Sequence, residues 1–222
     1  MPKKTESGNF SFLPTNLPQV VEINHKVFGD TRGYFMESYS RTDFIKAGIR
    51  TRFVQDNHSG NTQKYTLRGL HLQYPNYQPK LLRCVQGEII DYAVCVFPDT
   101  SPWFGDSASL TLSPENRRQF YIGTSSYGGQ PILYAHGYLV TTDQPTQVLY
   151  KAGNLYDRKS ELGLNPFDPD VRLNLPADIP SPLQMLSRGL LNQRDHDWPY
   201  LEKLAKQIWT HLPSTRKFSI AT

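Results

Sequence analysis

The sequence predicts an all-β fold, an antiparallel jelly roll arranged as a β-sandwich or barrel, with a short helical segment near its carboxyl end. Short runs of residues alternate between apolar and polar side chains, which is the period of a half-buried strand. Gly, Pro, Asn and Asp separate these runs at regular intervals. Up to residue 155, no helical pattern is interleaved with them. We therefore expect two sheets that face each other around a ligand site.

Each strand of this prediction rests on one alternating run. Residues 1–19 are polar and rich in proline, so they are predicted to form an amino-terminal arm. Residues 20–176 are predicted as the jelly-roll domain, with a hairpin turn at Gln86-Gly87, and residues 177–222 as a helical extension that packs on it. The strands are expected at about residues 20–27, 34–39, 53–57, 65–73, 80–85, 88–97, 107–112, 118–122, 133–141 and 147–152.

One helix is predicted, from Asp197 to Trp209. Asp197 is a suitable amino-terminal cap, and Pro199 falls in the first turn, where a missing N–H is tolerated. The apolar residues of this segment recur at helical spacing and form one face, which consists of Leu201, Leu204, Ala205 and Ile208.

Composition narrows the class of protein. A chain of 222 residues suffices for one large all-β domain with a substantial core. The net charge of +4 is scattered along the chain, so no nucleic-acid partner is predicted, although a small anionic ligand is permitted. The two cysteines, Cys84 and Cys95, lie in apolar strand-like sequence and are expected to be reduced, buried thiols. No signal peptide or membrane span is recognisable, so we expect a cytoplasmic protein without a membrane partner.

The predicted strand at 65–73 carries the most unusual side chains, because Arg68 and His71 interrupt its apolar alternation. A metal site on such a strand typically needs a second histidine two positions from the first, so that both point inward. Gln73 occupies that position, and His136 is a distant candidate from another strand. No metal site is therefore predicted.

Acid–base chemistry is the alternative, since histidine titrates near neutral pH and can remove a carbon-bound proton. Such a reaction needs a proton donor on the opposite face and a cation at the oxygen that becomes charged. Taken one at a time, each candidate for these roles also has a purely structural explanation. The candidates beside His71 are Tyr150, Tyr156, Lys80, Arg68 and Arg32.

The linear order of several short motifs resembles the dTDP-4-dehydrorhamnose 3,5-epimerase family, a group of cupin-type nucleotide-sugar epimerases. The similarity extends from about residue 20 to residue 201. Any one of these motifs is weak, whereas all of them in the family's order are a strong signal. The matching segments are Phe28–Glu37, Phe53–Ser59, Leu67–Gln73, Lys80–Glu88, Ser101–Gly105, Leu112–Asn116, Ala135–Gly137 and Leu149–Lys151.

The resemblance implies a role for each matched residue. His71 is implied to be the base that removes the proton next to the sugar's 4-keto group, and Tyr150 the acid that returns one from the other face. Asp195 is implied to orient His71, with Asp197 as the alternative, and Lys80 to stabilise the enolate oxygen. The resemblance further implies substrate contacts from Arg32, Glu37, Gln55, Asn57, Arg68, His136, Tyr156 and Arg194.

The predicted activity is therefore the inversion of C3, C5 or both in a nucleotide-diphospho-4-keto-6-deoxy sugar. The family resemblance implies that no cofactor is needed and that the protein is a homodimer. Two alternatives stay open: a non-catalytic cupin that binds a nucleotide sugar, and a metal-dependent cupin enzyme. The presence of both His71 and Tyr150 argues against the first alternative, and Gln73 argues against the second.

Two details of the motifs lead to structural expectations. Arg68 and His71 are three positions apart, so a regular pleat sends them to opposite faces of the sheet. A bulge at Gly69 is expected if both face one site, whereas an outward Arg68 could act across a dimer interface. Residues 123–133 are longer than the corresponding link in the family and are expected to be a flexible insertion beside His136.

Overall fold

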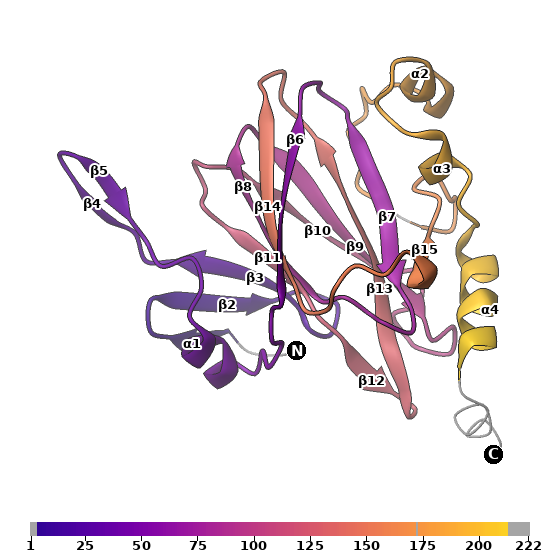
Figure 1. The fold of residues 1–222 in the computed structure, drawn as a ribbon, viewed down its shortest axis with the longest axis horizontal. Coiled ribbons are helices and arrows are strands. Elements are labelled where there is room, and N and C mark those ends of the chain that lie inside the picture. The colour runs from indigo at the N-terminus through magenta and orange to yellow at the C-terminus, as the bar shows by residue number, and fades with distance from the viewer. Residues whose placement is uncertain (1–3, 172, 213–222) are drawn as a thin grey trace.

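Two antiparallel sheets pack face to face in the computed structural model, which describes residues 4–171 and 173–212 (Figure 1). The predicted antiparallel all-β fold is confirmed. The seven-stranded sheet has the order β1-β2-β3-β11-β8-β14-β6. Its strands are β1 (Thr5–Ser7), β2 (Phe10–Pro14), β3 (Val20–His25), β11 (Gln119–Ile122), β8 (Lys80–Gln86), β14 (Thr146–Ala152) and β6 (Gln55–Asn61).

The second sheet has the order β10-β9-β13-β7-β15, and a short strand, β12, pairs with β13. Two further strands, β4 and β5, form a separate hairpin. The strands of the second sheet are β10 (Ser107–Leu112), β9 (Ile89–Phe97), β13 (Gln130–Val140), β7 (Leu67–Gln73), β15 (Glu161–Gly163) and β12 (Ser125–Tyr127), and those of the hairpin are β4 (Phe28–Asp30) and β5 (Gly33–Phe35).

Helices lie outside the sandwich. α1 (Arg41–Lys46) covers part of the seven-stranded sheet beside β1, while α2 (Pro182–Ser187), α3 (Gln193–His196) and α4 (Leu201–His211) cover the outer face of the six-stranded sheet (Figure 1). A single 3₁₀ turn spans Arg158–Ser160. In the described part of the chain, no helix combines the length and the apolar composition that a bilayer span requires.

The six-stranded sheet buries side chains on both faces, because it has a neighbour on each side. On the outer side, Leu70 and Leu72 of β7 belong to one buried cluster with Leu204 and Ile208 of α4. Inner-face residues of both sheets form the core of the sandwich, with each large side chain contributing about 1.5–3 kcal/mol on burial. This inner cluster includes Val20, Leu82, Phe120 and Val148 from one sheet and Ile89, Ala93, Tyr134 and Val140 from the other.

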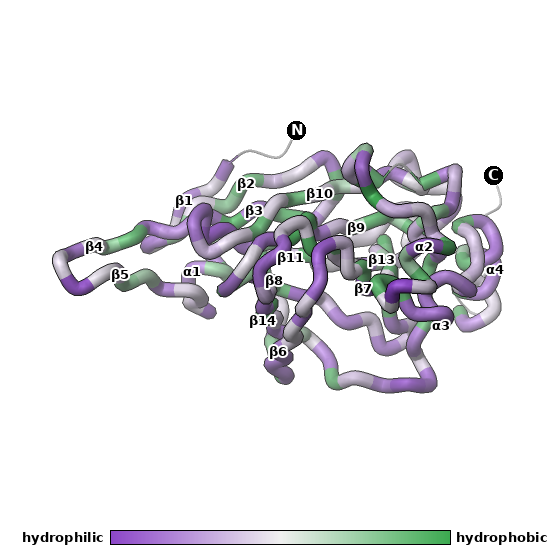
Figure 2. Tube along the Cα trace, turned by 90° about the horizontal axis from the view of Figure 1, so that it is seen from above, coloured by the Kyte–Doolittle hydropathy of each residue, from purple (hydrophilic) through white to green (hydrophobic). Residues whose placement is uncertain are grey.

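The amino-terminal segment forms more regular structure than an arm. β1 pairs with β2, and β2 pairs with β3 from Phe10 opposite His25 to Pro14 opposite Val21. Its apolar side chains pack with Phe44 of α1 in a separate cluster. The β4–β5 hairpin projects away from both sheets, as Figure 2 shows from above, and it replaces the longer strand expected at 34–39.

One expectation near the other end of the chain was wrong. Asp197 does not cap the long helix: it is the C-cap residue of α3, and α4 begins at Leu201. The reason is Pro199, which disfavours the helical conformation at the residue before it and so separates the two helices. Residues 213–222 of the predicted extension lie outside the described residues.

The insertion at 123–133 is a regular hairpin rather than a flexible loop. Tyr127 pairs with Gln130, and the turn between them consists of Gly128 and Gly129, whose φ angles are +55° and +77°. Glycine adopts these angles without strain, which lets a two-residue turn join β12 to β13. Cys84 and Cys95 are free and buried, as predicted.

Candidate active site

A bulge in β7 brings Arg68 and His71 to the same side of the strand. Tyr138 of β13 lies opposite Arg68 and His136 lies opposite His71, so three steps along β7 match two along β13. Gly69 lies within the extra step, with a φ of +113°. A Cβ atom there would lie 2.7 Å from the carbonyl oxygen of His136, so only glycine fits. The irregularity predicted at Gly69 is confirmed.

His71 is held by Asp195, a residue of α3. Its Nε2 lies 2.7 Å from Asp195 Oδ1, and the carboxylate is fully buried. Three further donors reach the same carboxylate: the Gly69 N–H at 3.1 Å, Asn192 Nδ2 at 3.2 Å and Trp198 Nε1 at 3.3 Å. β15 pairs with β7 from Gln73 to His71, and Asp195 accepts the hydrogen bond of the next free part of that edge, the Gly69 N–H. The side chain of Asp197, in contrast, is 60% exposed.

The surroundings of Asp195 keep it ionised. Burial raises the pKa of Asp195, but the hydrogen bond and charge of His71, the Gly69 N–H and Arg194 outweigh burial, so the net pKa is lowered. An ionised carboxylate can only accept a hydrogen bond, so the His71 nitrogen that faces it, Nε2, carries the hydrogen. In the neutral ring Nδ1 is therefore the acceptor. This arrangement leaves Nδ1 as a base of fixed orientation.

A second histidine–carboxylate pair lies beside the first. His136 Nε2 is 2.7 Å from Asp91 Oδ1, and both side chains are buried. Burial lowers the pKa of His136 against the opposing effect of Asp91, so the imidazole is neutral. The other carboxylate oxygen, Asp91 Oδ2, is buried and has no hydrogen-bond partner among the residues that the structure describes. Sequence reasoning missed Asp91, although a carboxylate within the apolar run Ile89–Phe97 was a signal for it.

Lys80 comes from the opposite sheet, on the inner face of β8. Its Nζ donates a hydrogen bond of 3.3 Å to the carbonyl of Gln78. Burial lowers the pKa of Lys80 to about 8, and the negative charges of Asp91 and Glu161 limit the fall. At neutral pH the ammonium group is therefore mostly protonated, although it loses its proton far more readily than a lysine in water.

Tyr150 also belongs to the inner face of the seven-stranded sheet. It lies opposite Asn57 of β6 and Leu82 of β8, and it packs against the inner cluster. Burial raises the pKa of Tyr150 and the neighbouring Tyr138 adds to this rise, while Arg68 opposes it. The phenol is consequently neutral and carries a proton at physiological pH.

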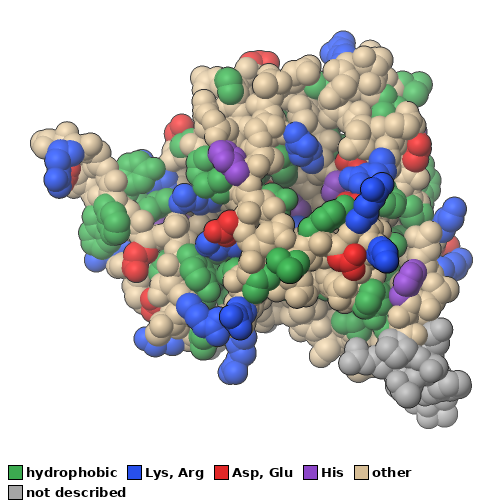
Figure 3. All heavy atoms as spheres, viewed as in Figure 1, with side chains coloured by type: hydrophobic (Ala, Val, Ile, Leu, Met, Phe, Trp, Pro, Cys, Tyr) green, Lys and Arg blue, Asp and Glu red, His purple; other side chains and the backbone are tan. Residues whose placement is uncertain are grey.

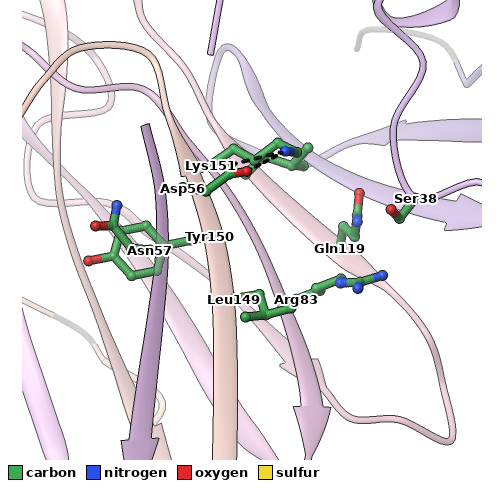
Figure 4. A pocket seen from close by; sticks show the side chains of 9 residues that line it. Ser38, Asp56, Asn57, Arg83, Gln119, Leu149, Tyr150 and Lys151 are labelled. Carbon is green, nitrogen blue, oxygen red and sulfur yellow. Dashed lines mark hydrogen bonds and ion pairs between the residues drawn. The ribbon is translucent and has the colours of Figure 1, made fainter. Parts of the chain in front are cut away.

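The side chains around β14 divide between the two faces of the sheet. In Figure 4, Tyr150 and Asn57 point to one side, whereas Lys151 and Arg83 point to the other. The outer side holds a pocket of about 230 Å³, in which Lys151 pairs with Asp56. The histidines belong to the inner side, and Figure 3 shows histidine side chains set back below the surface on the face where Figure 1 places β6 and β7.

Gln55, Asn57, Tyr156 and Arg194 come together in a network near this inner face. Gln55 accepts a hydrogen bond from the Tyr156 N–H at 3.0 Å and donates to Asn57 Oδ1 at 2.8 Å. Glu161 Oε2 accepts from the Tyr156 hydroxyl at 2.9 Å and from Arg194 Nη1 at 3.0 Å. Glu161 was not among the predicted residues, since its short strand had no recognisable pattern.

Two predicted residues do not join this group within one chain. Arg32 lies at the tip of the β4–β5 hairpin, pairs with Asp30 at 2.6 Å, and has a side chain that is 89% exposed. Glu37 follows the hairpin and accepts a hydrogen bond of 2.6 Å from Asn9. The hairpin extends away from β7 (Figure 1), so Arg32 and His71 are far apart in a single chain.

Gln73 has a structural role at the position where a metal site would need a histidine. Its amide nitrogen donates to the carbonyls of Asn76 and Leu155, and its oxygen accepts from the Asp157 N–H. It thereby fixes the connection from β14 to β15. Among the described residues, no three His, Cys, Asp or Glu side chains form a group that could hold a metal ion.

Known proteins resemble the chain over most of its length. The family model described as dTDP-4-dehydrorhamnose 3,5-epimerase matches residues 14–203. The dTDP-4-dehydrorhamnose 3,5-epimerase of Shigella flexneri is 41% identical over 170 residues, which are 76% of this chain and 88% of that enzyme. The enzyme of the same name from Methanothermobacter thermautotrophicus is 36% identical over 196 residues, which are 88% and 97% of the two chains.

The fold is similar to that of solved epimerases. The crystal structure of dTDP-6-deoxy-D-glucose-3,5-epimerase from Legionella pneumophila, in complex with dTDP-4-keto-L-rhamnose, superposes with a TM-score of 0.75 at 31% identity. The match covers 90% of this chain and 96% of that one. The chain belongs to the dTDP-4-dehydrorhamnose 3,5-epimerase family of isomerases, as its motifs predicted.

Proposed function

We propose that the protein inverts C3, C5 or both of a nucleotide-diphospho-4-keto-6-deoxy sugar of the dTDP-4-dehydro-6-deoxyglucose type. One observation carries this proposal: His71, oriented by a buried Asp195, faces from one sheet toward the sheet that carries Tyr150. A base and an acid on two sides of a sugar remove a proton from one face and return one to the other. This is the arrangement that inversion requires.

His71 performs the first step. Nδ1 takes the proton from the carbon next to the 4-keto group, the C–H bond breaks, and its electron pair forms an enolate with the charge on the C4 oxygen. The Asp195 carboxylate stabilises the imidazolium that results, and its hydrogen bond keeps the ring aimed at the substrate. The network of donors around Asp195 makes this orientation rigid.

Lys80 stabilises the enolate. A buried ammonium group close to a developing oxyanion is worth far more than one in water, because the surroundings are poor in competing dipoles. His136 lies opposite His71 in the sheet and, held neutral by burial, is a second contact for the sugar. The Asp91 carboxylate lies near both His136 and Lys80, and its negative charge offsets the positive charge of Lys80.

Tyr150 completes the reaction by giving its phenolic proton to the enolate carbon from the opposite face. The positive charge of Arg68 favours the phenolate that forms. Tyr150 then regains a proton from solvent, and His71 loses one to it, so the enzyme returns to its starting state. A second cycle at the other carbon inverts that centre as well.

This chemistry involves no change in oxidation state, and the residues above account for every proton. We therefore propose a reaction without a cofactor. Cys84 and Cys95 are buried free thiols, which suits a reducing compartment and the cytoplasmic location that we propose.

We also propose a homodimer in which the β4–β5 hairpin carries Arg32 and Glu37 to the substrate of the other subunit. Several observations support this. Arg32 is far from His71 within one chain, and three aromatic side chains of the hairpin, Phe28, Tyr34 and Phe35, are 43%, 55% and 66% exposed. A projecting hairpin with exposed aromatic residues is typical of a protein–protein contact. Forked guanidinium groups suit diphosphate oxygens.

Solvent exchange tests the proposed reaction. The purified protein is incubated in deuterium oxide with 4-keto-6-deoxy sugars linked to dTDP, CDP or GDP, and NMR follows deuterium at C3 and C5. We expect incorporation with at least one of them, and none with His71→Ala. Absence of exchange with all three sugars would contradict the proposal, and full exchange in His71→Ala would show that another residue is the base.

A further inference from the structure

Arg68 is held in the active site by neutral acceptors. Its Nε donates to Asn61 Oδ1 at 2.8 Å, and its Nη2 donates to the carbonyl of Gly60 at 3.3 Å. Within the described part of the chain, Arg68 forms no ion pair. In that part of the chain, no paired carboxylate therefore offsets the positive charge of the exposed Arg68 guanidinium.

Asn61 is fixed in the orientation that this contact needs. It is 5% exposed, at the end of β6, opposite Thr146. Its Nδ2 donates to the carbonyl of Thr146 at 3.3 Å and to the hydroxyl of Tyr138 at 3.3 Å. Because the Thr146 carbonyl can only accept, the amide nitrogen must face it, and Oδ1 therefore faces Arg68.

Tyr138 connects this contact to the rest of the site. It is 4% exposed and lies directly opposite Arg68 across the bulged β7–β13 pair. Its hydroxyl, which Asn61 contacts, also forms a 2.7 Å hydrogen bond with Ser59 Oγ of β6. The chain of contacts from Ser59 through Tyr138 and Asn61 to Arg68 crosses between the two sheets without a single negative charge.

We propose that Asn61 is a positioning residue that holds Arg68 through an uncharged acceptor and so reserves its positive charge for the diphosphate of the substrate. An aspartate of the same shape at this position would form an ion pair with Arg68 and compete with an incoming anion. This inference rests on the proposed function for the identity of the anion. It does not depend on whether proton transfer occurs.

The test compares a ligand that has phosphates with one that has none. Calorimetric titration measures the affinity of dTDP and of thymidine for the wild type, Asn61→Asp and Asn61→Leu. We expect Asn61→Asp to weaken dTDP binding about tenfold or more, which corresponds to about 1.4 kcal/mol, and thymidine binding to change less than about twofold. Asn61→Leu should weaken dTDP less than Asn61→Asp, because it removes an acceptor without adding a charge.

The same pair of ligands in an Arg68→Leu background shows whether Asn61 acts through Arg68. If it does, adding Asn61→Asp to Arg68→Leu changes dTDP affinity by less than about twofold, because the effects of coupled residues are not additive. Equal losses in both backgrounds, or unchanged dTDP binding by Asn61→Asp, would overturn the proposal. An equal loss for dTDP and thymidine would show a purely structural effect.

Steady-state kinetics add a readout that separates this inference from the proposed function. In Asn61→Asp the KM for the nucleotide sugar should rise about as much as the Kd for dTDP, and kcat should fall by a smaller factor, because the added carboxylate also offsets the charge with which Arg68 favours the Tyr150 phenolate. If the wild type lacks epimerase activity, the proposed function fails while the dTDP titrations still decide the role of Asn61. If Asn61→Asp does not fold, Asn61→Leu and Tyr138→Phe decide it, since both should weaken dTDP and spare thymidine.

Discussion

His71 Nε2 lies 2.7 Å from Asp195 Oδ1, although 124 positions separate the two residues in the chain. The contact joins β7 to α3, a short helix in the carboxyl-terminal segment. The buried Asp195 carboxylate accepts four hydrogen bonds, and removing it would leave buried donors without a partner. The orientation of His71 thus depends on the segment after the jelly roll.

Replacing Asp195 with asparagine should lower kcat by a factor on the order of 10³, because the amide can hold His71 in the wrong tautomer and cannot stabilise its positive charge. KM should change little, since Asp195 does not face the substrate directly. Steady-state kinetics would measure both. Asp197→Asn is the matched control, two positions away and exposed, and should behave as the wild type; a similar loss in both variants would contradict the assignment.

Tyr150→Phe should separate proton removal from inversion. His71 remains able to form the enolate, so deuterium should still enter the substrate by return of the proton to the original face. Inverted product should fall by a factor of about 10² or more, because the donor on the other face is gone. NMR of the substrate and product in deuterium oxide measures both quantities, and normal inversion without Tyr150 would show that another group is the acid.

The activity should decline as the pH rises through about 8, the pKa of Lys80. Above this pH Lys80 of the free enzyme is neutral and no longer stabilises the enolate charge, so kcat/KM falls. Stability changes in the opposite direction: the folded pKa lies below the unfolded value of 10.5, so the folded protein gains stability relative to Lys80→Met as the pH rises above about 8. Profiles of kcat/KM and of urea unfolding against pH test these two trends, and a flat kcat/KM from pH 7 to pH 9 would contradict the first.

Gly69→Ala should destabilise the protein by at least about 2 kcal/mol, because a side chain is strained at a φ of +113° and its Cβ meets the His136 carbonyl at 2.7 Å. Urea unfolding followed by tryptophan fluorescence measures the change. Gly60→Ala is the control, because its Cβ would have no neighbour within 4 Å and its φ is not in the left-handed region. If both variants lose the same stability, the bulge does not require glycine.

Arg32→Ala should raise the KM for the nucleotide sugar without affecting the stability of the monomer fold, since Arg32 lies at the exposed tip of the hairpin, where it pairs with the neighbouring Asp30. If Arg32 serves the other subunit, co-refolding Arg32→Ala with His71→Ala creates heterodimers that each have one intact site. At low substrate concentration, random assembly should restore about a quarter of the wild-type activity. Mixtures that are no more active than the two parents would show that Arg32 does not contribute to the site of the other subunit.

Asp91 and Glu161 illustrate why part of the site escaped prediction. Asp91 lies within an apolar run. It becomes part of the site through its hydrogen bond with His136, which belongs to a strand more than forty positions later in the chain. Glu161 belongs to a strand too short to show a period, and it becomes part of the site only through contacts with Tyr156 and Arg194. In both cases the informative feature is a long-range neighbour, which alternation along one strand does not encode.

The sequence by itself determined the antiparallel fold, the strand that carries His71 and the need for an irregular backbone at Gly69. These are local properties, because they follow from the period of two along a strand and from the three-position spacing between Arg68 and His71. Only the tertiary structure decided that Asp195, rather than Asp197, reaches His71, that Asn61 is the partner of Arg68, and that Arg32 lies far from its own active site. These relationships depend on which segments, distant in the sequence, lie side by side, and that is set by the packing of the two sheets and the carboxyl-terminal helices.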